Sequence, residues 1–504
     1  MVVLDKGCDI DVLLVIEGAY PYIKGGVSTC VQQLILGMPD TSFGVVFLGS
    51  RPEDYQGIQY ELPKNLVYLE SVFIFSPYEM VSLPKRLDGR GFHVLQEFLK
   101  DSRFFTPSPE LVDPAFYKTH ATFPAFLRSK HAWSSLFLEV YEKNGLNVPF
   151  VEFFWSLRNI FFPIWHLADA ANRLRGRKVK LVHSHSTGYA GLLGVFVKRV
   201  MGVPFVLTEH GIYVRERKAE ILGSQWIWRG QLQDKYRIDE LRDLWIRFFT
   251  NLGILSYHWA DRIYSLYEGA RSAQIHLGAP RAKTDILPNG VDVAHFARVR
   301  AHREKNVPPV VACIGRVVPI KDIKTFIKGI AVLAKRVPDV VGWIVGPEDE
   351  DPMYAEECRR LTRVLQLEQR VQFMGFQNLE GILPKVQIVA LTSISEGMPM
   401  VLLEAFAAGV PCVATDVGSC RQLICGGLNE EDKTLGEAGR IIKVGDVQGF
   451  AEACAELLLN EERWREAQLV AIERVQRFYT VERMVEQYRT AYRVLGTSNG
   501  RNIL

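Results

Sequence analysis

The feature that most constrains this chain is a short apolar run that ends at a glycine and is followed by a helical pattern. "DVLLVIEG" (11–18) is rich in β-branched residues and is typical of a buried strand. A loop follows, then "VSTCVQQLILG" (27–37) as a helix and "FGVVFLG" (43–49) as the next strand. Strand, glycine loop, helix and strand form a βαβ unit, which requires a parallel sheet.

The same pattern recurs along the 504 residues, which are too many for one hydrophobic core. Strands are expected at 180–185 and 204–211, a Pro-Asn-Gly turn at 288–290, and a second series that begins with "VVACIGR" after residue 307. We therefore predict an α/β protein with two Rossmann-like parallel-sheet domains that face each other across a cleft. The expected domains are 1–295, 296–475 and a C-terminal helix, 476–504, that packs back on the first domain.

Two stretches fit this scheme poorly, and we interpret them as insertions into the first domain. Residues 78–172 are rich in Phe, Trp and Tyr, and residues 215–257 combine many charges with several tryptophans. The aromatic residues favour the core of an insertion over a binding surface, because exposed aromatic patches are uncommon.

Composition excludes several classes of protein. The net charge of +3 gives no sign of a nucleic-acid or polyanion binder. The eight cysteines include no CxxC pair, which favours a reduced, cytoplasmic compartment. Early charges argue against a signal peptide, and the most apolar stretch, 150–170, is broken by Glu152, Arg158 and Pro163, so no membrane-spanning helix is expected.

Candidate ligand-binding residues follow the strands, because open parallel sheets bind ligands beyond the carboxyl ends of their strands. Gly25 and Gly26 open the first helix, where a bare backbone at a helix N-terminus favours a phosphate, although a plain tight turn is an alternative. Arg316 and Lys321 follow the first strand of the second series and suit a diphosphate, although a solvated loop is an alternative.

Two glutamates lie in the apolar stretch "SEGMPMVLLEAFAAG" (395–409). Burying an ionised carboxylate without a partner is costly, and this stretch contains no basic residue. A partner for Glu396 and Glu404 must therefore come from elsewhere in the fold or from a ligand. Helix side chains tilt towards the N-terminus, so both carboxylates are expected near the start of the helix that follows Pro399.

Histidines mark the first domain. His210 ends the strand "PFVLTEH" and can reach the cleft, although a satisfied strand-end histidine is an alternative. His183 and His185 share one face of their strand, but no third ligand is evident and we expect no metal site.

As an ordered set, "GGVS", "TEHG", "PNGVD", "GRVVPIKD" and "SEGMPMVLLEAFAAGVPCVATDVGS" resemble the retaining glycosyltransferases of family four, which have the GT-B fold. Glu396 and Glu404 match the spacing of that family's E-x7-E motif. "IEGAYPYIKGGVSTCVQQLI" and "TEHGIYVRER" look more narrowly like the cytosolic glycosyltransferases of bacterial Pel exopolysaccharide synthesis.

The resemblance implies a role for each residue. Arg316 and Lys321 would hold the donor diphosphate, Glu404 the ribose and Glu396 the sugar, with His210 beside the reacting carbon; these assignments leave Glu209 without a role. The other implied donor contacts are Gly25, Gly26, Gly346, Met374, Gly375, Gly397, Met398, Pro399 and Met400.

The implied reaction moves a hexose or N-acetylhexosamine from a UDP-sugar to a growing bacterial exopolysaccharide with retained configuration. The expected partners are the UDP-sugar donor, the polysaccharide acceptor and an inner-membrane Pel synthase complex, with no metal and no nucleic acid. Two alternatives remain: a sugar-nucleotide epimerase on the same fold, and a non-catalytic sugar-nucleotide-binding subunit of a polysaccharide synthase.

Overall fold

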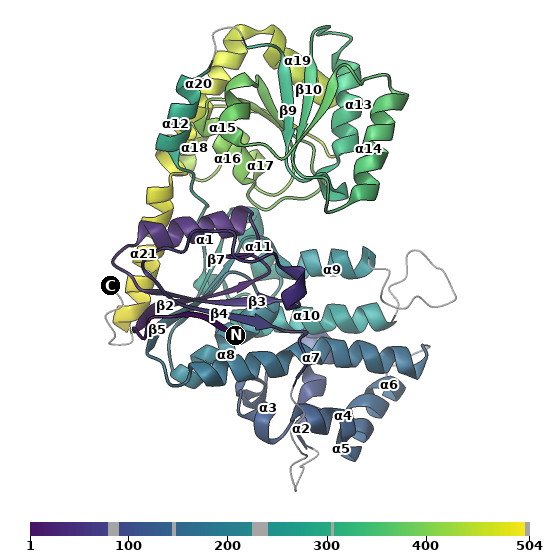
Figure 1. The fold of residues 1–504 in the computed structure, drawn as a ribbon, viewed down its shortest axis with the longest axis vertical. Helices are drawn as coiled ribbons and strands as arrows, with labels where there is room; N and C mark the ends of the chain where they lie inside the picture. The colour runs from purple at the N-terminus through teal and green to yellow at the C-terminus, as the bar shows by residue number, and fades with distance from the viewer. Residues whose placement is uncertain (79–89, 144–147, 224–239, 304–306, 499–504) are drawn as a thin grey trace. The chain divides into compact units, whose positions relative to one another are not determined.

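The computed structural model describes residues 1–78, 90–143, 148–223, 240–303 and 307–498, and it divides into two compact units (Figure 1). The N-terminal unit comprises residues 1–265, 271–285 and 488–504, and the C-terminal unit comprises 266–270 and 286–487. Each unit contains one open sheet with helices packed on it, as in a Rossmann-like domain.

The sheet of the N-terminal unit has the strand order β1-β4-β3-β2-β5-β6-β7-β8. β1 pairs with β4 in the antiparallel sense, and the pairings from β4 through to β7 are parallel. The strands are β1 (Val2–Asp5), β2 (Ile10–Glu17), β3 (Phe43–Gly49), β4 (Leu66–Phe73), β5 (Val179–Ser184), β6 (Phe205–Glu209), β7 (Arg262–Ser265) and β8 (Thr284–Ile286). The chain order reverses its direction between β2 and β5, at the topological switch point of this sheet.

Helices cover both sides of this sheet, with α1 (Gly26–Gly37) and α8 (Gly188–Met201) on opposite sides in Figure 1. α8 packs against both α7 (Phe150–Leu174) and α10 (Glu240–Trp259). α10 is the crossover helix that connects β6 to β7, with α9 (Tyr213–Gly223) before it. Residues 224–239 of the predicted insertion at 215–257 lie outside the described part, and the tryptophans and charges of its second half belong to the amphipathic helix α10.

The region between β4 and α7 adds short helices to the N-terminal unit. Its aromatic side chains form a core, as expected: Phe98, Phe126 and Phe161 are fully buried, and Trp165 donates to the carbonyl of Ala121 at 2.7 Å. The short α-helices are α2 (Arg90–Leu95), α3 (Phe116–Thr119), α4 (Phe123–Arg128), α5 (Lys130–Ala132) and α6 (Glu139–Lys143). Residues 79–89 and 144–147 of the predicted insertion lie outside the described part.

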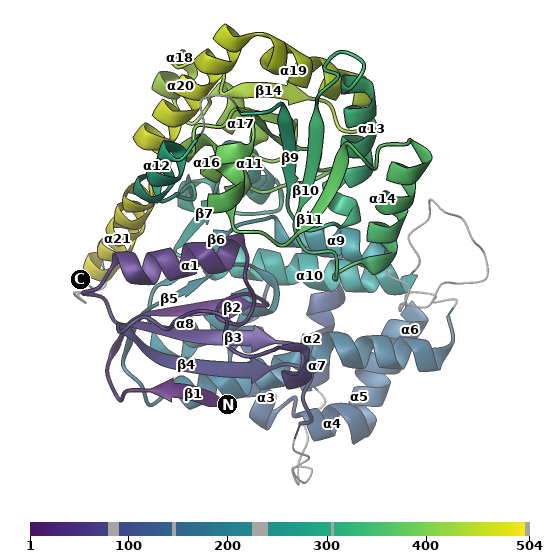
Figure 2. The same ribbon diagram turned by 45° about the horizontal axis from the view of Figure 1, so that its top comes forward.

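The sheet of the C-terminal unit has six parallel strands in the order β11-β10-β9-β12-β13-β14 (Figure 2). They are β9 (Val310–Ile314), β10 (Val341–Val345), β11 (Val371–Gly375), β12 (Ile388–Leu391), β13 (Cys412–Thr415) and β14 (Gly439–Ile442). Alternate residues of β9 enter different cores, because successive side chains of a strand point to opposite faces: Val310 and Ala312 join one, and Val311 and Cys313 the other.

Each core of the C-terminal unit is closed by its own helices. α13 (Ile323–Leu333), α14 (Pro352–Val364) and α19 (Val447–Leu459) cover one face. α12 (Val293–Ala301), α16 (Met400–Ala407), α17 (Cys420–Cys425) and α20 (Glu461–Phe478) cover the other. Both faces are therefore buried, which explains why the strands are continuous apolar runs.

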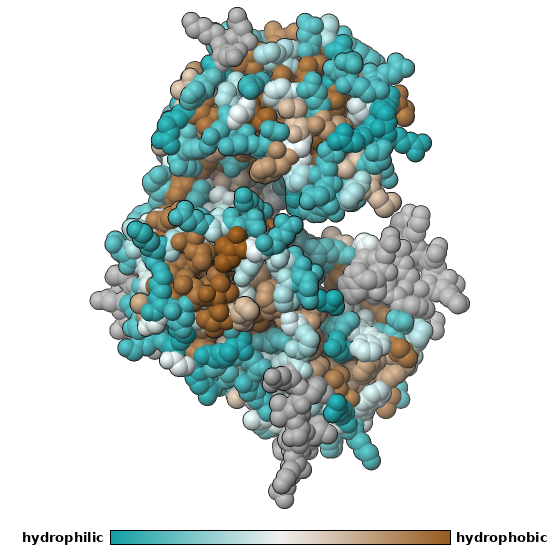
Figure 3. Space-filling view, viewed as in Figure 1, coloured by the Kyte–Doolittle hydropathy of each residue, from teal (hydrophilic) through white to brown (hydrophobic). Residues whose placement is uncertain are grey.

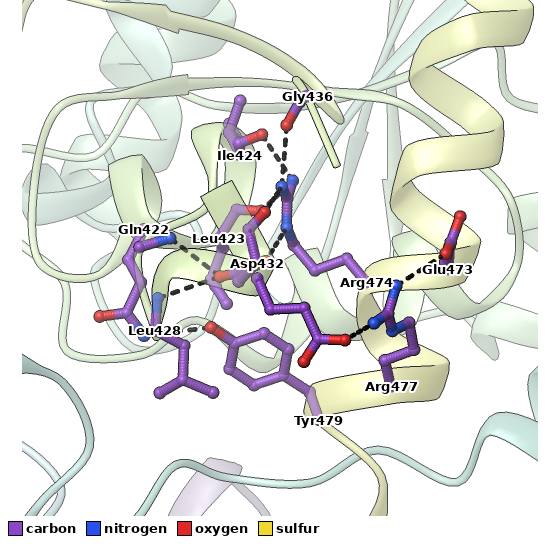
Figure 4. Close-up of polar contacts among 12 residues, drawn as sticks. Gln422, Leu423, Ile424, Leu428, Asp432, Gly436, Glu473, Arg474, Arg477 and Tyr479 are labelled. Carbon is purple, nitrogen blue, oxygen red and sulfur yellow. Dashed lines mark hydrogen bonds and ion pairs between the residues drawn. The ribbon is translucent and has the colours of Figure 1, made fainter. Parts of the chain in front are cut away.

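A buried ion pair fixes α20 to the loops of this unit (Figure 4). Arg474 and Asp432 are both fully buried, and Arg474 Nε donates to Asp432 Oδ1 at 2.6 Å. The guanidinium also donates to the carbonyls of Leu423, Ile424, Asp432 and Gly436, at 2.8–3.2 Å. Asp432 Oδ2 in turn accepts from the backbone of Gly427 and Leu428. Arg474 thereby joins α20 to carbonyls in α17 and to carbonyls in and just after the short helix α18 (Glu430–Thr434).

The division of the chain differs from the predicted boundaries. The units divide at 285/286 rather than near 295, because α12 packs on α16 of the C-terminal unit. The last helix, α21 (Val481–Ser498), begins in the C-terminal unit and returns to the N-terminal unit at Tyr488. There the Tyr492 hydroxyl lies 2.8 Å from His183 Nδ1, so the end of the chain completes the N-terminal unit.

The surface in view is mostly hydrophilic, but hydrophobic residues gather on the N-terminal unit around α1 (Figure 3). Within the described residues, no helix is both long enough and apolar enough to cross a membrane.

Candidate functional site

The C-terminal unit gathers its predicted residues at the carboxyl edge of its sheet. β9 lies between β10 and β12, so the chain order reverses between β9 and β12. Lys321 follows β9 and Glu396 follows β12, which places both beside this switch point. Crevices at such a position are where open α/β sheets bind ligands.

Glu396 has a partner within the fold. Lys321 Nζ lies 2.6 Å from Glu396 Oε1, and the hydroxyl of Ser393 donates to the same oxygen at 2.5 Å. The side chains are largely buried, with exposed fractions of 20% for Lys321 and 11% for Glu396. The Thr392 hydroxyl donates to the backbone carbonyls of Lys321 and Asp322, which holds the two loops together. Glu396 lies in the loop five residues beyond β12 rather than at the strand end.

Arg316 is the more exposed of the two predicted cations. It follows β9 and pairs with Glu350, with Arg316 Nη1 2.7 Å from Glu350 Oε1, and each side chain is about half exposed. An exposed pair of this kind contributes about 0–1 kcal/mol, so an anionic ligand could displace Glu350 at little cost. No pattern in the sequence indicates Glu350 as a partner.

Glu404 differs from Glu396 because its carboxyl group has no hydrogen-bond partner within the described residues. It lies in the second turn of α16 and is largely buried. Burial raises the pKa of its carboxyl group from 4.5 to about 7, and no hydrogen bond from the described residues opposes that effect. A buried acceptor left open in this way is suited to hydroxyl donors from a ligand.

The loops of this edge pack backbone against backbone. A Cβ on Gly346 would come within 2.0 Å of the carbonyl oxygen of Gly315, and Gly346 has a φ of +154°. A Cβ on Gly418 would come within 2.3 Å of the Glu396 carbonyl oxygen. The close approach to Gly315 explains why residue 346 is a glycine. At residue 375 the φ of +62° favours glycine, because it lies in the left-handed region.

One polar group at this edge was missed by sequence reasoning. The backbone N–H of Ser419 donates to the carbonyl of Gly397 at 2.9 Å, but its buried hydroxyl has no partner in the described structure. Met398 beside it is buried, and α16 begins at Met400 after Pro399 as its N-cap. The only signal in the sequence is a serine after β13 in "DVGS", which is too common to stand out.

The N-terminal unit brings His210 together with His185. His210 follows β6 and His185 follows β5, and His185 Nδ1 lies 3.0 Å from His210 Nε2. His185 Nε2 and His210 Nδ1 are buried without a partner in the described structure. Burial lowers the pKa of His210 to about 4 and that of His185 well below its usual value, so both rings are neutral at pH 7.

His183 is held differently from the other two histidines. Its Nδ1 contacts the Tyr492 hydroxyl at 2.8 Å and its Nε2 contacts the Thr208 hydroxyl at 2.9 Å. Both ring nitrogens are therefore occupied by hydroxyls. Within the described residues, no group of His, Cys, Asp and Glu side chains is placed to hold a metal ion.

The first loop leaves room beside its glycine. Gly25 is the N-cap of α1 with an extended φ of 169°, and a Cβ there would meet nothing within 4 Å. Neither backbone strain nor packing requires glycine at this position. Gly26 is the first residue of α1.

Glu209 is a structural acceptor, in keeping with the absence of an assigned role. It is fully buried and accepts hydrogen bonds from the hydroxyls of Tyr257 and Thr187, the side-chain amide of Gln274 and the backbone of Tyr213. Burial raises the pKa of its carboxyl group.

The predicted residues thus fall into one group on each unit. On the C-terminal unit Arg316 and Lys321 follow β9, Gly346 follows β10, and Met374 and Gly375 end β11. Glu396, Gly397, Met398 and Pro399 lie between β12 and α16, and Met400 and Glu404 lie in α16. On the N-terminal unit Gly25 and Gly26 lie at the start of α1, after β2, and His210 follows β6.

Comparison with known families divides the chain at the same place as the structure. Residues 10–282, more than half of the chain, match the family described as "Domain of unknown function (DUF3492)". The chain belongs to this family. Residues 308–460, which lie within the C-terminal unit, match the family "Glycosyl transferases group 1".

Curated relatives of this DUF3492 protein are glycosyltransferases. It is 28% identical over 251 residues to D-inositol 3-phosphate glycosyltransferase of Nocardia farcinica, covering 46% of this chain and 53% of the relative. It is 26% identical over 293 residues to UDP-Gal:alpha-D-GlcNAc-diphosphoundecaprenol alpha-1,3-galactosyltransferase of Escherichia coli, covering 56% and 66%. The matches span one third to two thirds of the length of the first curated relatives.

Solved structures show that the fold is GT-B. The chain matches HepE of Anabaena, crystallised with UDP and glucose, with a TM-score of 0.59 and 15% identity, over 96% of this chain and 99% of that one. It matches sucrose-phosphate synthase of Thermosynechococcus elongatus with a TM-score of 0.57 and 17% identity, over the same shares. The predicted fold class is confirmed: α/β, with two Rossmann-like parallel-sheet domains.

Proposed function

We propose that this protein is a retaining glycosyltransferase that moves a hexose or N-acetylhexosamine from a UDP-sugar to a growing bacterial exopolysaccharide. The observation that carries the proposal is the ion pair between Lys321 and Glu396 at the switch point of a group 1 glycosyltransferase domain. The short motifs of the N-terminal unit favour a Pel-type polysaccharide, by resemblance to PelF.

Lys321 and Arg316 are the proposed diphosphate-binding groups. Each now neutralises a glutamate, and a diphosphate brings more negative charge than either carboxylate. Binding of the donor would draw Lys321 away from Glu396 and leave the Glu396 carboxylate free to accept from sugar hydroxyls. The two cations would then stabilise the charge that develops on the departing diphosphate.

Glu404 is the proposed acceptor for the ribose hydroxyls. Burial raises the pKa of its carboxyl group, and two hydroxyl donors would lower that pKa and favour the carboxylate. This exchange explains why a carboxyl group is retained at a buried position in an apolar helix, where an alanine or leucine would otherwise be more stable.

The N-terminal unit would supply His210 to the transferred sugar, as the family resemblance implies. A neutral imidazole can donate or accept a hydrogen bond but carries no charge, so its role is to orient the sugar. Gly25 would leave space for the donor phosphate, since nothing else in the described structure accounts for a glycine there.

The proposed chemistry is attack on the same face of the sugar, assisted by the departing diphosphate. Retention by double displacement would need a carboxylate nucleophile, and Glu396 is assigned to sugar hydroxyls instead. Two cations beside the diphosphate can take the role of a divalent ion, so we propose catalysis without a metal. Activity should survive EDTA; loss with EDTA and recovery with magnesium or manganese would contradict this part.

A panel of UDP-sugars tests the proposal. Purified protein is incubated with UDP-glucose, UDP-N-acetylglucosamine and UDP-N-acetylgalactosamine, with and without polysaccharide fragments, and UDP release and product linkage are measured. Lys321→Met serves as the inactive variant, and Lys335→Met, an exposed lysine after α13, as its matched control. An epimerase would convert the donor without UDP release, and a non-catalytic subunit would bind UDP without turnover.

The proposed partner is an inner-membrane Pel synthase complex that exports the polymer, with the protein itself in the cytoplasm. Exposed aromatic groups of the 78–172 region are the candidate docking surface: Trp155 is 51% exposed and Phe104 is 73% exposed. Fractionation of cells with and without the partner proteins tests this idea. Unchanged distribution and unchanged polymer output after their deletion would contradict it.

A further inference from the structure

The N-terminal unit contains a cavity of about 1100 Å³ that the proposed donor site does not use. It is formed by the loops that follow β3 and β4, together with α4, α7 and α10. Its volume is in the range of sites that bind sizeable organic ligands. Residues that face it include Asp54, Phe75, Tyr78, Arg158, Asn159 and Trp245.

Arg158 shows that this cavity is built for a polar ligand. Its guanidinium lies 4.5 Å from the centre of the Phe162 ring and 5.6 Å from that of Trp155. Within the described residues it has no carboxylate partner, and its one hydrogen bond goes to Asn159 Oδ1 at 3.0 Å. Burial lowers the pKa of Arg158, so its environment is partly desolvated. Several N–H donors of a planar cation therefore remain open beside aromatic faces.

The rest of the lining combines apolar faces with acceptors. Phe75 is 37% exposed and lines the cavity, although most phenylalanines of this unit are buried. Trp245 is held in place because its indole N–H donates to Ser156 Oγ at 3.0 Å. Glu53 and Asp54 add carboxylates at the rim. Saccharides present apolar C–H faces and a ring of hydroxyls that donate and accept, which matches aromatic walls with a cation on one side and carboxylates on the other.

The position of the cavity separates it from His210. Both lie at the carboxyl edge of one sheet, but β3 is three strands and β4 four strands away from β6. At about 4.8 Å per strand, the cavity lies roughly 14–19 Å along the edge from the end of β6. A single sugar at His210 cannot fill it, whereas an extended oligosaccharide can reach both.

We propose that this cavity is a saccharide-binding subsite that holds a distal part of the acceptor glycan, in which Phe75 and Tyr78 contact sugar faces and Arg158 donates to hydroxyls. The inference rests on the proposed function, because it assigns the acceptor as a chain of sugars. It adds that recognition extends beyond the sugar that receives the transfer, so the enzyme prefers longer acceptors.

The test measures binding and transfer against acceptor length. Linear oligomers of glucose, N-acetylglucosamine and N-acetylgalactosamine, one to six units long, are titrated into the full chain by calorimetry and used as acceptors. Phe75→Ala and Arg158→Leu probe the cavity. Leu469→Ala, which removes an exposed apolar side chain of α20, and Arg199→Leu, which removes an exposed arginine of α8, are the controls. Thermal melting checks the fold of each variant.

We expect affinity for one oligomer series to rise with length, and both cavity variants to weaken the longest oligomer at least tenfold while the controls do not. In transfer assays the cavity variants should raise KM for the long acceptor and leave KM for the donor unchanged. The inference is overturned if no oligomer binds, or if the cavity variants bind as tightly as wild type. UDP binding to the wild-type chain distinguishes failure of the subsite from failure of the proposed function. If the chain binds UDP but no oligomer, only the subsite is refuted. If the chain does not bind UDP, the proposed function is refuted.

Discussion

Glu404→Gln provides a quantitative test of the buried carboxyl group. The pKa of Glu404 is about 7 in the folded protein and 4.5 in an unfolded chain. Between pH 4.5 and 7 the folded protein therefore keeps the carboxyl proton that the unfolded chain loses. Stability must therefore fall as pH rises from about 4.5 to 7, since the unfolded chain ionises first. The full difference in pKa corresponds to roughly 3 kcal/mol of unfolding free energy. This is an upper limit, because the protein can relax around the charge.

Glutamine keeps the volume of the side chain but cannot ionise. The variant and the wild type should therefore unfold with similar free energies near pH 5, and the variant should be more stable by roughly 1–3 kcal/mol at pH 8. Urea denaturation at half-unit intervals from pH 5 to 8 measures the difference. Glu368→Gln, at an exposed position of the same unit, should show no such pH dependence.

A constant difference between Glu404→Gln and wild type across this range would refute the reasoning. It would mean that Glu404 ionises in the folded protein with its ordinary pKa, because solvent or a group outside the described residues stabilises its charge. If the ribose assignment is correct, affinity for UDP should also rise up to about tenfold per pH unit between pH 5 and 7 in the wild type. In the variant, affinity should be flat.

Three further predictions concern the same unit. Lys321→Met or Arg316→Ala should lower kcat/KM about 10- to 150-fold, because a charge-assisted contact is worth about 1.5–3 kcal/mol; steady-state kinetics with melting controls check this, and near-normal turnover in both would remove the assignment. Glu396→Gln should lower kcat even at saturating donor, whereas Glu404→Gln should mainly raise KM; the reverse pattern would exchange the two roles. Arg474→Met should cost about 3–5 kcal/mol of unfolding free energy, because it leaves Asp432 buried with a charge and no cation; a denaturant-measured loss below about 1 kcal/mol would contradict this.

Sequence periodicity predicted most of the sheet strands, because both faces of the sheets are covered and the strands are continuous apolar runs. Periodicity did not predict β4. Its sequence contains Glu70, which is buried and paired with Arg173 and with the Tyr68 hydroxyl. Arg173 is 103 residues away along the chain, so no local pattern could have shown that this charge is neutralised.

The candidate site was predictable in its residue types and less so in its pairings. Arg316, Lys321, Glu396 and Glu404 stand in short motifs with fixed spacing. The partner of Glu396 is 75 residues away and comes from another strand end, so only the strand order reveals it. The contact between His185 and His210 also requires the strand order to be known, because it depends on β5 and β6 being neighbours.

The return of α21 to the first unit has a consequence for how the protein is made. A chain emerging from the ribosome completes residues 286–487 before Tyr488 and Tyr492 exist, so the second unit can close while the first still lacks its final helix. Until then His183 is without the hydroxyl that occupies its Nδ1 in the finished protein. A messenger truncated after residue 487 would thus yield a C-terminal unit with its full residue set beside an N-terminal unit with an open flank. Cellular quality control of misfolded protein would therefore act on the N-terminal unit, which was synthesised first.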